Sequence, residues 1–154
     1  MEKDTIYETI YETIRIKLKV SEPRATVTDP DSVASLLKNI LSGLDADQEH
    51  FIILTLNKAN AVTGYKLVHT GGQDETLCDP RSIFRHALLM GATALILCHN
   101  HPSGRPEPSA EDRALTAKLA SAGKMLGIKI LDHIIIGGDS FSSFAARGLL
   151  DFIA

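Results

Sequence analysis

Two histidines and one aspartate stand close together in the stretch "LCHNHPSGRPEPSAED", residues 97–112. His99 and His101 are two residues apart at the end of an apolar run, and side chains at that spacing on a strand point to the same face. Asp112 follows a turn-rich segment, at the start of an expected helix. Two imidazoles and one carboxylate that converge form a zinc ligand set, with the fourth position open for water. The stretch therefore predicts a catalytic metal site.

Each part of this pattern also has a simpler explanation. Ser109 and Asp112 have the spacing of a capping box, in which the two residues bond each other at a helix start. Two histidines at a strand end are often only polar residues at the rim of a sheet. Asp112 nevertheless shares a helix face with Leu115 and Leu119, and burying a carboxylate is costly unless it is paired or bound to a metal. The combined pattern favours metal binding.

The letters "HNH" at residues 99–101 do not indicate an HNH nuclease. Those enzymes spread their motif over a ββα unit, whereas here the three residues are adjacent. Cys98 should point to the opposite face of the strand from the histidines. It is therefore a poor candidate for a further ligand and is expected to pack in the core.

The elements that must position these residues follow from hydrophobic periodicity. The apolar run "TALILC", residues 93–98, predicts a central strand covered on both faces. The segment after Ser109 predicts a helix with a stripe of Leu115, Leu119, Ala122 and Leu126, which ends at Gly127. The histidines would leave the strand beside the start of this helix.

The remaining elements alternate between helices and strands. Asp-Pro pairs at residues 29–30 and 79–80 predict helices that end at Gly43 and Gly91. Strands are expected over residues 15–20, 49–57, 64–72, 128–137 and 140–145, with 49–57 and 64–72 forming a hairpin; residues 6–14 stay undecided. This alternation predicts an α/β sandwich around a mixed sheet.

Bulk properties exclude several classes of protein. The chain has 154 residues and a formal net charge of −3, with basic residues scattered among acids, so strong nucleic-acid binding is not expected. No apolar run approaches the roughly 20 residues that span a bilayer. The first residues lack a signal-peptide layout, and two cysteines form no disulfide framework. We expect a cytoplasmic protein without a membrane segment.

The pattern His99-x-His101-x7-Ser109-x2-Asp112 resembles the JAMM motif of the JAB/MPN metalloprotease superfamily. Together with "LDHIIIGG" and "SFSSFAARGLL", it resembles the RadC family within that superfamily, over roughly residues 27–150. The resemblance implies an α/β fold with a mixed, curved sheet flanked by helices, of the cytidine-deaminase-like kind. It divides the chain into an N-terminal segment, 1–26, and a JAB/MPN RadC-like domain, 27–154.

The resemblance also implies roles for individual residues. His99, His101 and Asp112 would hold one Zn²⁺ per chain. Glu49, in "QEHF", would hold the zinc-bound water and act as general base, and Ser109 would stabilise the oxyanion.

Periodicity alone does not choose Glu49 over Glu75, Glu107 or Glu111. It places Glu49 only at the head of a strand, in phase with Phe51. The role of the pair Asp132-His133 stays open between supporting the site and fixing strand ends.

The sequence therefore predicts a zinc-dependent metallohydrolase that cleaves peptide or isopeptide bonds in an unidentified peptide or protein, through a zinc-activated water. The alternative is a DNA-repair-associated RadC-like protein that binds metal without peptidase activity. Many RadC chains carry a helix-hairpin-helix region, for which residues 1–26 are too few, so this sequence gives a DNA role little support. Nothing in the sequence indicates the oligomeric state.

Overall fold

A computed structural model describes residues 26–27, 29–71 and 78–150. Five strands form one mixed sheet in the order β2-β1-β3-β4-β5, in which only β3 and β4 run parallel. The strands are β1 (His50–Leu56), β2 (Val62–Thr70), β3 (Ala94–Asn100), β4 (Lys129–Gly137) and β5 (Ser140–Ser143); the helices are α1 (Pro30–Leu41), α2 (Pro80–Leu89) and α3 (Ala110–Leu126). The predicted α/β architecture with a mixed sheet is confirmed.

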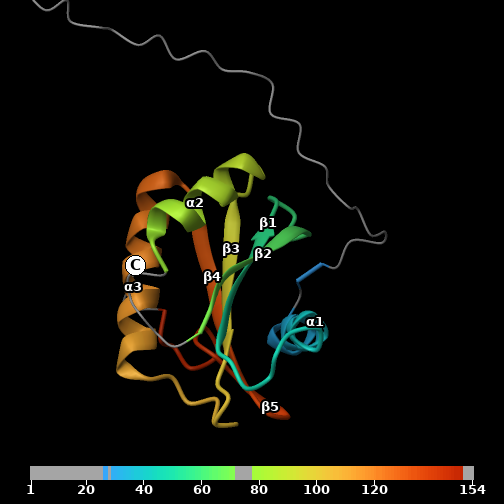
Figure 1. Cartoon of the computed structure of the whole chain (residues 1–154). Coiled ribbons are helices and arrows are strands. Elements are labelled where there is room, and N and C mark those ends of the chain that lie inside the picture. The colour runs from blue at the N-terminus through green and yellow to red at the C-terminus, as the bar shows by residue number, and fades with distance from the viewer. Residues whose placement is uncertain (1–25, 28, 72–77, 151–154) are drawn as a thin grey trace, which may run out of the picture.

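Helices cover both faces of the sheet. Figure 1 shows α1 on one side and α2 with α3 on the other. Alternate residues of β1 face the two layers: Ile52 packs on the α1 side, whereas Phe51 and Ile53 pack toward α2 and α3. All seven residues of β1 are buried, which explains why its sequence is apolar apart from His50 and Thr55.

Side-chain caps explain where the helices begin. The carboxylates of Asp29 and Asp79 accept hydrogen bonds from the backbone N–H groups of Ser32 and Arg81, and a proline follows each cap. α3 ends at Gly127, which has a left-handed backbone conformation with φ of 71°. The predicted helix starts and the predicted end of α3 are confirmed.

The buried face of α3 differs from the predicted stripe. Leu126 is 48% exposed, so its place in the stripe was wrong. The buried face runs instead through Asp112, Thr116, Leu119 and Gly123. At position 123 this face has no room for a side chain, because a Cβ on Gly123 would meet the ring of Phe84 and the backbone of Ile128.

The N-terminal half of the sheet agrees with the sequence where the structure describes it. The expected hairpin is confirmed as the antiparallel pair β1–β2, although β2 begins at Val62 rather than at residue 64. The segments 6–14 and 15–20 lie outside the described residues. Among the described helices, none has the length and apolar character needed to cross a membrane.

Candidate metal centre

The candidate site lies where β1 begins and β3 ends. The antiparallel register pairs Phe51 with His99. Continuing that register by two residues places Glu49 opposite His101. Two chain segments that are about fifty residues apart therefore meet at one end of the sheet because β1 and β3 are neighbours.

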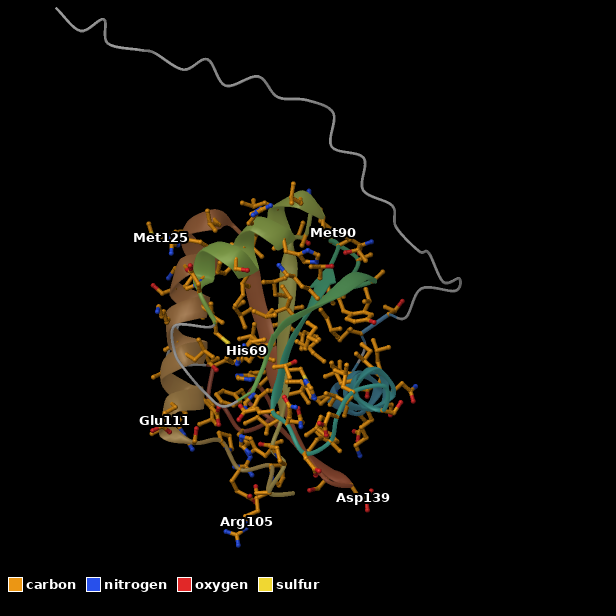
Figure 2. The ribbon with its side chains drawn as sticks, viewed as in Figure 1. His69, Met90, Arg105, Glu111, Met125 and Asp139 are labelled. Atoms are coloured by element: carbon orange, nitrogen blue, oxygen red, sulfur yellow. The ribbon has the colours of Figure 1, made fainter. Side chains whose placement is uncertain are left out.

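The loop after β3 is tied to the end of β4. The backbone N–H of His101 donates to the carbonyl of Ile136 at 2.8 Å. A Cβ on Gly137 would lie 2.6 Å from the backbone nitrogen of Pro106, so the loop can approach β4 this closely only at a glycine. Figure 2 shows Arg105, in this loop, at the same end of the molecule as Glu111 at the start of α3.

The structure brings together four of the residues singled out in the sequence. His99 Nε2 lies 2.9 Å from His101 Nε2 and 3.0 Å from Asp112 Oδ1. Asp112 Oδ2 lies 3.5 Å from His101 Nε2, and Glu49 Oε1 lies 3.9 Å from His99 Nε2. Ligand atoms of Glu49, His99 and His101 all fall within 4.8 Å of one another, as a metal site requires. Either carboxylate could complete a set with the two histidines.

Burial separates the two sides of the site. The side chains of His99 and Asp112 are 1% and 2% exposed, whereas those of His101 and Glu49 are 16% and 20% exposed. An ion held by these residues would therefore be reached from the side of Glu49 and His101.

Asp112 acts as a helix cap and faces the histidines at the same time. Its Oδ2 accepts from the backbone N–H of Ser109 at 2.7 Å, and its own N–H donates to Ser109 Oγ at 3.0 Å. Oδ1 remains directed at His99. Burial would raise the pKa of this carboxyl, but His99 and the bonds from Ser109 together hold the pKa well below its usual range. The capping and metal-binding interpretations are therefore compatible.

The hydrogen bond of His101 assigns its tautomer. His101 Nδ1 lies 2.7 Å from the carbonyl oxygen of Arg105. A carbonyl only accepts hydrogen bonds, so Nδ1 carries the proton. In a neutral His101 the lone pair is consequently on Nε2, the atom that faces His99 and Asp112.

The donor set fits a small divalent cation. Nitrogen and oxygen ligands about 2.0–2.1 Å from a tetrahedral zinc lie about 3.3 Å from one another. The two histidine Nε2 atoms are 2.9 Å apart, and Asp112 approaches His99 with Oδ1 at 3.0 Å and His101 with Oδ2 at 3.5 Å. Their spacing and chemistry therefore suit the zinc that the resemblance implies.

Asp132 and His133 are neighbours in β4 but bond to different parts of the structure. His133 is fully buried, and its Nε2 lies 2.8 Å from His99 Nδ1. Burial holds the pKa of His133 well below its usual range. Asp132 instead accepts from Ser143 Oγ at 2.6 Å and from the N–H of Ala145 at 2.9 Å. His133 thus supports the site, while Asp132 fixes the end of β5.

Sequence reasoning assigned no role to Asn100. Its Oδ1 accepts from the N–H of His50, and its Nδ2 donates to the carbonyl of Gln48, each at 2.8 Å. These bonds hold the residues on both sides of Glu49. The sequence held one signal for this role. Asn100 stands between two histidines that share a face, so its side chain must point to the opposite face of the strand.

Cys98 lies in the core on the α1 side, as predicted for a residue facing away from the histidines. Burial raises the pKa of its thiol well above the usual range. Cys98 therefore has a packing role.

Comparisons with known proteins agree with this geometry. A model of the RadC-like JAB domain family matches residues 27–149. A UPF0758 protein of Desulforamulus reducens is 40% identical over 136 residues, which cover 88% of this chain and 59% of that protein. A UPF0758 protein of Salinibacter ruber is 43% identical over 130 residues, which cover 84% of this chain and 55% of that protein. The chain thus spans less than two thirds of the length of these relatives. It belongs to the RadC-like JAB domain family.

Proposed function

We propose that the protein is a zinc-dependent metallohydrolase that cleaves peptide or isopeptide bonds, with His99, His101 and Asp112 as the metal ligands. The observation that supports this most is the close approach of their ligand atoms, at 2.9, 3.0 and 3.5 Å. Imidazole nitrogens and a carboxylate approach this closely when a positive charge, either a shared proton or a metal ion, lies among them. A divalent cation would supply that charge to all three side chains at once.

When bound, zinc lowers the pKa of a coordinated water from about 15.7 toward about 7 and polarises a substrate carbonyl. The side chains of this protein would supply the remaining steps. Asp112 and His99, both buried, would form the rigid wall of the site.

Glu49 would be the general base. Its carboxylate is 20% exposed and lies 3.9 Å from His99 Nε2, farther from that atom than Asp112. It would accept a proton from the attacking water and return it to the leaving nitrogen.

Ser109 would be the oxyanion donor. Its Oγ accepts the N–H of Asp112, so the hydroxyl is held beside a proposed metal ligand. The hydroxyl proton would be donated to the oxygen of the tetrahedral intermediate.

A library experiment tests the proposal. Zinc-loaded protein would be incubated with a mixed peptide and isopeptide library, and cleaved products would be identified by mass spectrometry. Glu49→Gln should keep the metal and lose about 10²–10⁴-fold in rate, because it removes the proton acceptor. Glu111→Gln is the matched control, since Glu111 is an exposed glutamate in the first turn of α3; it should cleave like the unchanged protein.

The outcomes distinguish the two functions considered from the sequence. Cleavage that requires both zinc and Glu49 supports the hydrolase. Zinc binding without any cleaved product would contradict it and favour a metal-binding protein without peptidase activity.

A further inference from the structure

We propose that Thr116 and His133 are positioning residues that fix the tautomer of His99, so that its Nε2 lone pair faces the metal site. This inference rests on the proposed function in that His99 is taken as a ligand. It concerns a chain of hydrogen bonds that runs from the backbone of α3 through β4 to β3.

The chain begins at a backbone carbonyl of α3. Thr116 Oγ1 donates to the carbonyl oxygen of Asp112, one helical turn earlier, at 2.6 Å. A threonine in a helix commonly bonds to this carbonyl. Because a hydroxyl has a single proton and a carbonyl can only accept, the bond commits that proton.

The second bond of the chain runs from His133 to Thr116. His133 Nδ1 lies 2.6 Å from Thr116 Oγ1. The hydroxyl proton is already committed to Asp112, so His133 Nδ1 must carry the proton of this bond and donate it.

The surroundings of His133 then determine the state of its other nitrogen. The ring is fully buried, with the rings of Phe144 and Phe51 at centroid distances of 4.7 and 5.8 Å. Such apolar surroundings disfavour a charged imidazolium. A neutral ring with a proton on Nδ1 has a lone pair on Nε2.

The last bond sets His99. His99 Nδ1 lies 2.8 Å from His133 Nε2, which can only accept, so His99 Nδ1 donates. In a neutral His99, the form that binds a metal, the lone pair is then on Nε2, the atom directed at His101 and Asp112. Fixing a ligand tautomer through a partner on the second ring nitrogen is a general device of metal sites.

The two histidine ligands therefore obtain the same tautomer by different routes. His101 donates directly to the carbonyl of Arg105. His99 reaches the carbonyl of Asp112 through His133 and Thr116. The backbone of one proposed ligand thereby sets the proton position of another.

Thr116→Val tests the chain because it removes the hydroxyl and keeps the branched shape. Without an acceptor for Nδ1–H, His133 would favour the opposite tautomer and present a proton to His99. We expect zinc affinity, measured by competition with a chromophoric chelator, to fall by about 10–100-fold. Thr116→Ser restores the hydroxyl and should bind zinc within about threefold of the unchanged protein, by the same reasoning.

Thr55→Val is the matched control, because it makes the same replacement of a buried hydroxyl at a position away from the histidines. Thr55 is fully buried, and its Oγ1 donates to the carbonyl of Gly64 at 3.1 Å, in the β1–β2 pair. This variant should lower the melting temperature and leave zinc affinity unchanged. A fall in affinity that is equal in Thr55→Val and Thr116→Val would overturn the proposal.

A spectroscopic measurement tests the proton positions without a substrate. Long-range ¹H–¹⁵N correlation spectra of the zinc-loaded protein should show His133 protonated on Nδ1 only. In Thr116→Val the Nε2-protonated form should appear. His133 protonated on Nε2 in the unchanged protein would overturn the chain, even if zinc binds and peptides are cleaved. If the His133 spectrum is as expected but no peptide is cleaved, the result would contradict the proposed function and leave this inference standing.

Discussion

The two carboxylates of the candidate centre are held in opposite ways. Asp112 is buried at the start of α3, bonded to Ser109 and in contact with both histidines. Glu49 is 20% exposed at the start of β1, and the backbone on both sides of it is held by Asn100. The difference agrees with the proposed roles, in which Asp112 would keep one position beside an ion and Glu49 would meet solvent and exchange protons.

The largest effect should come from removing a ligand on the histidine side. Loss of a residue that only supports a ligand typically lowers metal affinity by about 10–100-fold. His101→Ala removes a proposed ligand itself and should lower zinc affinity by more than this. Because His101 is partly exposed, the apoprotein should still fold. Metal analysis after dialysis measures the loss, and full zinc retention would remove His101 from the ligand set.

Zinc removal should have the next largest effect. At about one hundred times Kd, a ligand that binds only the folded state contributes about 2.7 kcal/mol. For a chain of this size, that corresponds to roughly 5–10 °C in Tm. Thermal unfolding with and without zinc should show this difference in the unchanged protein and in Glu49→Gln, but not in His101→Ala. An equal Tm with and without zinc would contradict binding to the folded state.

The smallest effect should come from Asn100→Ala, which releases the backbone around Glu49. The N–H of His50 loses its acceptor at 2.8 Å, so its hydrogen exchange should accelerate. Turnover of a substrate found in the library should fall about tenfold through misplacement of Glu49, while zinc affinity stays unchanged.

Asn57→Ala is the control for this variant, because Asn57 Oδ1 also holds two backbone N–H groups, those of Ala59 and Ala61. It should leave the exchange of His50 unaltered. A zinc affinity that falls in Asn100→Ala would show that Asn100 supports the metal rather than Glu49.

Local signals were sufficient for much of the fold. The Asp-Pro pairs 29–30 and 79–80 and Gly127 mark helix ends through short-range bonds and backbone conformation, which depend on neighbouring residues only. The convergence of His99, His101 and Asp112 also followed from strand and helix periodicity.

Contacts between distant elements could not be obtained this way. The role of Thr116 depends on β4 bringing His133 against α3. Periodicity places Thr116 on the helix face of Asp112 and Leu119 but does not identify its partner. The exposure of Leu126 and the close approach of Gly123 to Phe84 are likewise properties of packing between elements. The two hydrogen bonds by which Asn100 holds His50 and Gln48 could likewise be found only from the β1–β3 register.

The most direct test of the central claim compares the two carboxylates by bound zinc. Asp112→Asn and Glu49→Gln would each be dialysed against trace zinc, and metal per chain would be measured. We predict that Asp112→Asn loses the ion and that Glu49→Gln retains about one per chain. Retention by Asp112→Asn together with loss from Glu49→Gln would contradict the account.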